Sequence, residues 1–140
     1  MSKTNPVVHF EMPGEDLNRM KKFYEKAFSW KINQLGPDMG EYVVVSTTET
    51  DDKRMVTMPG TINGGFYKKT EDPLSHHPSV VIAVEDINEA IKKVKEAGGT
   101  VIGGQKRDGT PDMIPGVGLY ASIIDTEGNR ISVLQPKEMQ

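Results

Sequence analysis

The segment His9–Ile32 reads HFEMPGEDLNRMKKFYEKAFSWKI, and a second segment, Ser79–Ile102, reads SVVIAVEDINEAIKKVKEAGGTVI. A shift of half the chain length lays the first segment over the second. The identical pairs are Glu15/Glu85, Asp16/Asp86, Asn18/Asn88, Lys22/Lys92, Ala27/Ala97 and Ile32/Ile102. Self-similarity at a fixed spacing marks a repeated structural unit. The sequence therefore predicts two copies of one module, joined near the polar stretch 70–78.

Each copy begins with the alternation typical of a strand and continues with the spacing typical of a helix. The apolar positions of the two predicted strands are Val8, Phe10 and Met12 in the first copy and Val80, Ile82 and Val84 in the second. Asp16 and Asp86 are the predicted helix N-caps. Gly98 and Gly99 should end the second helix, because glycine accepts the left-handed conformation common at a helix end. We expect the apolar face of each strand to pack against the helix that follows it.

Three short apolar runs, separated by turn residues, follow each helix. They span 30–34, 41–47 and about 62–68 in the first copy, and 100–104, 118–125 and 130–135 in the second. The predicted fold class is α+β: two tandem βαβββ modules, about 5–70 and 77–136, within one domain spanning 1–140. Such modules should form a curved mixed sheet with helices on its outer face and a concave cleft, the default ligand site. The Gly- and Pro-rich stretch 109–118 is expected to be a loop, either a flap over the cleft or an ordered surface loop.

Composition narrows the classes of function. Lys and Arg number 17 and Asp and Glu number 20, so the formal net charge is 17 − 20 = −3, and no basic run exceeds two residues. This balance argues against nucleic acid or a membrane as the main partner. The absence of cysteine excludes disulfides, thiolate metal sites and a cysteine nucleophile. Since the first residues lack the apolar core of a signal peptide and no run is long enough to span a membrane, we expect a cytoplasmic protein.

Four segments together resemble the vicinal oxygen chelate superfamily, which contains glyoxalase I, bleomycin-resistance proteins and extradiol dioxygenases. They are VVHFEMPGEDLNRMKKFYEKAFSWKI (7–32), INGGFYKK (62–69), VVIAVEDINEAIKKVKEAGGTVI (80–102) and IPGVGLYASIIDTEGNRISVLQP (114–136). The strongest pieces are FYEKAF-W, AVEDI-EA---V--AGG and D-EGN-I, in which Thr126 stands where the superfamily often has proline. The resemblance covers essentially the whole chain and implies the duplicated fold, but it singles out no individual member.

The resemblance also implies where a metal would be held: by a histidine at the start of the first strand of each module and by a glutamate or similar residue on the last strand of each. His9 matches the first of these positions. Ser79 and Ser132 stand where the second histidine and a glutamate would be, and 61–70 contains no carboxylate. A catalytic divalent ion normally has about three protein ligands. The prediction is therefore no tightly bound metal, with His9 as the remaining candidate ligand.

His9 and Glu11 lie two residues apart on one face of the first predicted strand, about 7 Å apart at the backbone. They are the candidate catalytic residues, acting as a base and its orienting partner. The alternatives are a polar pair in a wet cleft and a pair of metal ligands. His76 and His77 in the polar linker are a second pair of candidate ligands, set against the solvated role usual for such a pair. Gly64–Gly65 predicts either a bend in its strand or a close approach of the backbone to a ligand.

The candidate ligand-binding residues are His9, Glu11, Ser79, Tyr120 and Ser132. The first functional hypothesis is a binder of a small organic molecule, of the resistance or sequestration type, without a cofactor. The alternative is a glyoxalase-type lyase or isomerase that uses His9 with a divalent metal such as Zn, Ni, Fe or Mn. A third reading is a metal-free enzyme with His9 as general base. The sequence leaves open whether any reaction is catalysed, and it leaves a homodimer open as well.

Overall fold

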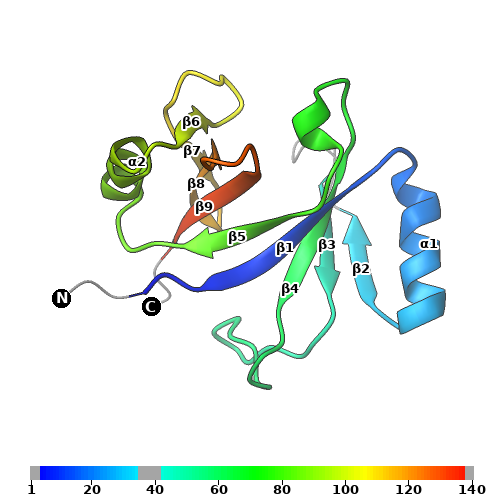
Figure 1. The fold of residues 1–140 in the computed structure, drawn as a ribbon. Coiled ribbons are helices and arrows are strands. Elements are labelled where there is room, and N and C mark those ends of the chain that lie inside the picture. The colour runs from blue at the N-terminus through cyan, green and yellow to red at the C-terminus, as the bar shows by residue number, and fades with distance from the viewer. Residues whose placement is uncertain (1–3, 35–41, 138–140) are drawn as a thin grey trace. The chain divides into compact units, whose positions relative to one another are not determined.

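The computed structural model describes residues 4–34 and 42–137. The chain divides into two compact units, which we describe separately. The N-terminal unit is His9–Pro78. The C-terminal unit comprises the described residues of Ser79–Gln140 together with those of Met1–Val8, so the first strand begins in one unit and continues in the other (Figure 1).

Both units have the predicted order of a strand, a helix and further strands. The first elements are β1 (Val7–Gly14), α1 (Leu17–Phe28), β2 (Lys31–Gln34), β3 (Val43–Ser46) and β4 (Asn63–Lys68), followed by a short 3₁₀ helix (Pro73–Ser75). The elements of the C-terminal unit are β5 (Ser79–Ala83), α2 (Ile87–Glu96), β6 (Thr100–Gly103), β7 (Asp112–Ile114), β8 (Gly118–Ile124) and β9 (Arg130–Pro136). The α+β prediction is confirmed. The predicted start of the third strand, at position 41, lies outside the described residues.

The strands pair in the same way in the two units. In the N-terminal unit β2 is antiparallel to β3, β3 is antiparallel to β4, and β4 is parallel to β1. In the C-terminal unit β6 is antiparallel to β8, β8 is antiparallel to β9, and β9 is parallel to β5. In each unit the first strand therefore pairs with the last.

One strand of the C-terminal unit was missed. The stretch 109–118 was expected to be a loop, but Asp112–Ile114 forms β7, which pairs with β8 in antiparallel register. The strand is only three residues long and lies among glycines and prolines, so it shows too little alternation to be recognised from sequence. Its backbone pairing with β8 gives the middle of this stretch a regular structure.

Both helices begin at the predicted N-caps, and their C-terminal ends differ from each other. Asp16 Oδ1 accepts the Arg19 amide at 3.0 Å, and Asp86 Oδ1 accepts the amides of Asn88 and Glu89. Such caps satisfy amides that have no partner within the helix. At the other end α1 closes on Ser29, which takes a left-handed conformation with φ of 60°. No helix in residues 4–34 and 42–137 is long and apolar enough to cross a membrane.

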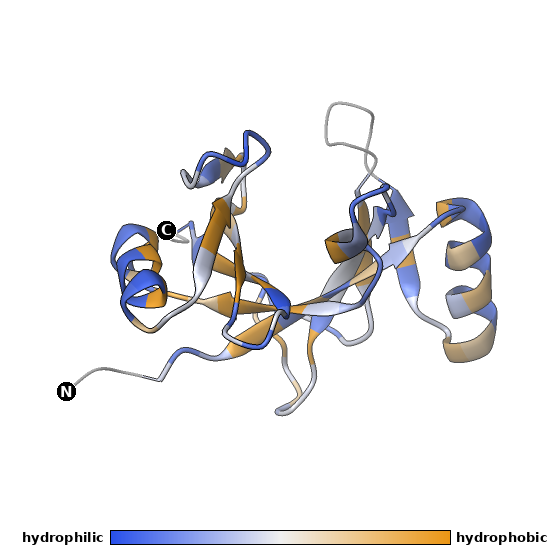
Figure 2. Cartoon of the chain, turned by 45° about the horizontal axis from the view of Figure 1, so that its top comes forward, coloured by the Kyte–Doolittle hydropathy of each residue, from blue (hydrophilic) through white to orange (hydrophobic). Residues whose placement is uncertain are grey.

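The strands of each unit bury their apolar face against the helix of the same unit. The core of the N-terminal unit contains Leu17, Ile32, Val43, Val45 and Phe66, with Phe10, Met12, Met20, Tyr24 and Trp30 packed against it. The core of the C-terminal unit contains Val84, Ile87, Ile91, Ala121 and Val133, with Ile82, Ala90, Val101 and Leu119 around it. Figure 2 shows hydrophobic and hydrophilic segments alternating along both helices, as expected for helices with one buried face.

The D-EGN-I segment is a structural turn between β8 and β9. Asp125 Oδ1 accepts the amides of Glu127 and Asn129, and its Oδ2 accepts the Asn129 side-chain amide. The Asn129 bonds, first of all that of its side chain, hold the pKa of Asp125 below its usual range. Gly128 supplies the positive φ, 88°, that this turn requires. These contacts explain the motif by backbone geometry.

Candidate functional site

Glu11 is a buried carboxylate on the face of β1 opposite α1. Its neighbours Phe10 and Met12 pack with the helix in the core, so strand alternation places Glu11 on the helix-free face. Its side chain is 6% exposed. The hydroxyl of Tyr42, the residue preceding β3, donates a hydrogen bond to Glu11 Oε2 at 3.2 Å. This bond orients the carboxylate within the N-terminal unit.

A glycine makes room for Tyr42. Gly65 on β4 lies opposite Glu11 in the parallel pairing, and a Cβ atom at this position would overlap the Tyr42 ring and hydroxyl. On the other face, a Cβ at Gly64 would overlap the Phe10 ring and carbonyl oxygen. Both glycines keep regular pairing with β1 and β3, so the predicted bend is wrong. Each glycine instead accommodates a neighbouring aromatic residue.

His9 is half-buried and lies two residues before Glu11 on β1. Burial lowers the pKa of His9 below 6.5, and the nearby Glu11 carboxylate opposes this with a smaller effect. The imidazole is therefore mainly neutral at neutral pH, and can both donate and accept a hydrogen bond. The residue opposite His9, Asn63, is engaged elsewhere: its Oδ1 accepts the amides of Thr47 and Thr48 after β3.

The C-terminal unit carries hydroxyl groups on the face of its sheet that bears Ser132. Ser132 is fully buried, and its Oγ lies 2.5 Å from the Tyr120 hydroxyl. Arg130 donates a hydrogen bond from Nη2 to Ser79 Oγ at 3.3 Å. The structure thus joins Tyr120 to Ser132 and Ser79 to Arg130, while His9 and Glu11 belong to the other unit.

Sequence reasoning missed Tyr42 and Arg130. Tyr42 begins the run Tyr42-Val43-Val44-Val45, in which apolar and polar residues do not alternate, so the pattern does not show which face is buried. Arg130 could have been found, because it lies two residues before Ser132 on a predicted strand and therefore shares its face. Its guanidinium adds a positive charge to a row of residues that otherwise offers hydroxyl groups.

The donor set does not fit a tightly held divalent metal. In the sheet register, Gly65 occupies in the N-terminal unit the position that Ser132 occupies in the C-terminal unit. The four positions implied by the superfamily resemblance therefore hold His9, Ser79, Gly65 and Ser132: one imidazole, two hydroxyls and no side chain. Within residues 4–34 and 42–137, no three His, Asp or Glu side chains are grouped to hold an ion. Divalent metals prefer imidazole and carboxylate ligands.

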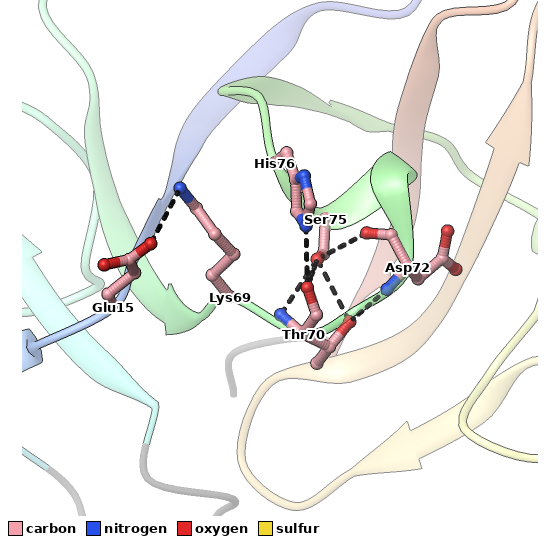
Figure 3. A network of polar contacts seen from close by, with 6 residues as sticks. All are labelled: Glu15, Lys69, Thr70, Asp72, Ser75 and His76. Carbon is pink, nitrogen blue, oxygen red and sulfur yellow. Dashed lines mark hydrogen bonds and ion pairs between the residues drawn. The ribbon is translucent and has the colours of Figure 1, made fainter.

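The two linker histidines take part in loop structure (Figure 3). His76 Nε2 lies 2.7 Å from the Thr70 carbonyl oxygen, which can only accept, so this nitrogen carries the proton. Ser75 Oγ adds bonds to Thr70 and to the Asp72 carbonyl oxygen. The His77 carbonyl oxygen accepts the Tyr67 hydroxyl. These contacts give the segment between β4 and β5 an ordered conformation, in which His76 takes part through its side chain and His77 through its backbone.

The sequence model of the family described as the Glyoxalase/Bleomycin resistance protein/Dioxygenase superfamily matches residues 7–133. The chain belongs to this superfamily. A glyoxylase-like domain-containing protein of Didymella fabae is 29% identical over 121 residues, which are 85% of this chain and 84% of that protein.

Solved structures of other proteins share the fold. A hypothetical protein from Bacillus halodurans aligns with a TM-score of 0.66 and 17% identity, covering 99% of each chain. Methylmalonyl-CoA epimerase from Mycobacterium tuberculosis aligns with a TM-score of 0.66 and 13% identity, covering 99% of this chain and 94% of the other. At such identities the likeness is one of fold, because one superfamily fold supports many chemistries.

Proposed function

We propose that this superfamily member binds a small organic molecule on the helix-free face of its N-terminal unit, with no tightly held metal and in a cytoplasmic setting. The supporting observation is the buried Glu11 carboxylate, held by Tyr42 beside the half-buried His9. Burying a carboxylate is costly unless it is hydrogen-bonded, and a buried, oriented carboxylate beside an imidazole offers a polar group to a ligand. Glu11 would accept hydrogen bonds from the ligand, and the neutral His9 would donate or accept one.

Ser79, Tyr120 and Ser132 are the ligand-binding residues that we propose for the C-terminal unit. Their support is the Tyr120–Ser132 hydrogen bond and the contact of Ser79 with Arg130. Hydroxyl groups on a sheet face are suited to orienting a polar substituent of a ligand. These residues and those of the N-terminal unit belong to different units, so each assignment is tested with its own substitution.

A fragment screen by two-dimensional NMR tests the binding proposal. The probes are benzylamine, benzamide and benzoate, which share one ring and differ in charge. Binding should shift the amides of His9, Glu11 and Gly65, and Glu11→Gln should abolish these shifts. Glu71→Gln, which changes an exposed carboxylate of the same unit, should leave them unchanged. If no probe shifts these amides, or if both variants act alike, the proposal is wrong.

A second candidate is an enzyme that uses His9 as a general base without a metal. It is favoured by the lowered pKa of His9, since a neutral imidazole can accept a proton. Replacing His9 by glutamine should then abolish turnover of any substrate found, while binding persists.

The third candidate, a metal-dependent lyase or isomerase, has less support because its donor set is incomplete. Elemental analysis after purification without chelators tests it. We expect no stoichiometric metal, and near-stoichiometric Zn, Ni, Fe or Mn lost in His9→Gln would overturn the metal-free proposal.

A further inference from the structure

We infer that the N-terminal unit has a second binding site, a groove at the start of α1 that takes a small organic anion with an apolar body. The groove has a volume of about 580 Å³, within the range of small-molecule sites. Its lining residues are Pro13, Gly14, Glu15, Asp16, Arg19, Met20, Phe23 and Lys69. His9, Glu11 and Tyr42 are not among them, so this site is independent of the function proposed above.

The apolar part of the groove is formed by Met20 and Phe23 of α1 and by Pro13 of β1. Met20 Sδ lies 2.6 Å from the position that a Cβ atom of Gly14 would take, so the thioether packs closely on the backbone. Phe23 is 58% exposed, and an aromatic ring left open to water gains free energy when a ligand covers it. The flexible methionine beside it can adapt to ligands of different shape.

The groove lining carries two cations, Arg19 and Lys69, and two carboxylates, Glu15 and Asp16, each of which already has a partner. Glu15 and Lys69 form an ion pair at 3.9 Å (Figure 3), and the Glu15 side chain is 73% exposed. Such an exposed pair is weak, so a ligand anion can replace Glu15 at Lys69. Asp16 is committed to the helix cap: the Arg19 amide is bonded to its carboxylate and lowers its pKa.

Helix α1 adds to the positive charge beside the groove. Its charged residues are Arg19, Lys21, Lys22 and Lys26 against Glu25, a net charge of 4 − 1 = +3 in a chain whose net charge is −3. Helix α1, which carries the groove's aromatic ring, is thus positively charged overall, and its Arg19 lines the groove. A ligand with one anionic group and one apolar body matches both features.

The same helix contains a matched control. Phe28 is 60% exposed, close to the 58% of Phe23, but only Phe23 lines the groove. Both rings contact Tyr24, at centroid distances of 5.0 and 6.0 Å. Phe28 also contacts Phe23, at a centroid distance of 6.3 Å, so Phe28→Ala removes a similar exposed ring next to the groove and leaves every lining residue in place.

The test uses two fluorescent probes with the full chain: 8-anilinonaphthalene-1-sulfonate, an amphipathic anion, and the uncharged N-phenyl-1-naphthylamine. Phe23→Ala should weaken binding of the anionic probe about tenfold, and Phe28→Ala should change it by less than about twofold. Arg19→Gln combined with Lys69→Gln should weaken the sulfonate and leave the uncharged probe unaffected. Urea unfolding verifies that each variant is folded.

A gain in affinity is the most specific expectation. Glu15→Gln removes the carboxylate that competes for Lys69 and should strengthen sulfonate binding about two- to threefold. Glu25→Gln makes the same change in net charge away from the groove lining and should have a smaller effect. A weakening of sulfonate binding in Glu15→Gln, or an equal effect of the two variants, would contradict an anion site at Lys69.

Mapping on the unaltered protein keeps the inference testable should a variant fail to fold. The sulfonate should shift the NMR amide signals of Gly14, Arg19, Phe23 and Lys69, and leave those of His9 and Glu11 in place. Shifts confined to other regions, or equal losses in Phe23→Ala and Phe28→Ala, would overturn it. Because the fragment test reads His9 and Glu11, either proposal can fail while the other stands.

Discussion

The two units share strand order and register but fill them with different side chains. Phe66 pairs with Met12 and Val133 pairs with Ile82, so Gly64-Gly65-Phe66 in one unit corresponds to Ile131-Ser132-Val133 in the other. The N-terminal core is aromatic, with Tyr24 stacked on Trp30 at 4.7 Å, whereas the C-terminal core is aliphatic. The space between strands and helix can be filled by large rings beside glycines or by medium-sized side chains throughout. The topology therefore depends on the pattern of apolar positions and does not require particular residues.

The strand faces that lie away from the helices differ in charge between the two units at equivalent positions. Glu11 lies opposite Gly65 in one unit, and Val81 lies opposite Ser132 in the other. Only the first unit has a carboxylate in this pair. Since both sheets form equally well, the chemistry of this face is independent of the module fold, as expected where function is added to a stable scaffold.

The largest expected effect is on the aromatic core. Phe66→Ala should lower the free energy of unfolding by about 3–5 kcal/mol, because Phe66 is fully buried and contacts Tyr24 and Trp30. Val133→Ala, at the equivalent position, removes fewer atoms and should cost about 1–3 kcal/mol. Urea unfolding of both variants measures the difference. Equal losses would mean that the ring has no special role in the first core.

The next largest effect concerns the room made for Tyr42. Gly65→Ala should cost about 1–3 kcal/mol, since the added methyl group overlaps the tyrosine. In a Tyr42→Ala background the same change should cost much less, because the obstructing ring is gone. A double-mutant cycle measures this coupling. Additive losses would show that Gly65 is required for another reason.

A smaller effect on stability is expected at the C-terminal ends of the two helices, and its sign differs between them. Ser29 adopts φ of 60° after α1, whereas Gly98 adopts φ of 96° after α2. Ser29→Gly should raise the free energy of unfolding by about 0.5–1 kcal/mol, because glycine occupies the left-handed region without strain. Gly98→Ser should lower it by about 1 kcal/mol. Thermal unfolding of the two variants checks the opposite signs, and a loss of stability in Ser29→Gly would refute the strain argument.

The smallest effect is a change in pH dependence at His9. The pKa of His9 in the folded protein lies below the ordinary value of 6.5. As the pH falls from 6.5 to this lower pKa, the unfolded chain takes up a proton at His9 that the folded chain does not. The free energy of unfolding therefore decreases with falling pH, from 6.5 down to the lowered pKa. His9→Gln should flatten this part of the profile in urea unfolding. A profile as steep as that of the unaltered protein would contradict the lowered pKa.

The cause of the His9 shift has its own test. Glu11 raises the pKa of His9 against the larger effect of burial. Glu11→Gln should therefore lower the pKa of His9 further, as read from its imidazole NMR signals. A rise in that pKa would show that the carboxylate is not the neighbour that acts on His9.

Much of the fold could be predicted because its signals are local. Alternation identified the apolar face of β1, and the Asp16 and Asp86 caps located both helices. The three-residue β7 could not be predicted, since its pairing with β8 depends on a neighbouring strand and not on its own pattern. Nor could the sequence distinguish between the readings of Gly64–Gly65, because the obstructing groups come from Phe10 and Tyr42, far away in the chain.

For this protein the sequence alone determined the module: its helices, the strands that alternate, and the family to which the repeated segment belongs. These follow from periodicity and capping, which act over a few residues. The tertiary structure decided which groups the candidate residues contact. Hydrogen bonds join Tyr42 to Glu11, Arg130 to Ser79 and His76 to the Thr70 carbonyl oxygen. A groove lies beside α1. Tyr42 is 31 residues from Glu11 and Arg130 is 51 residues from Ser79, so no local pattern encodes these two contacts.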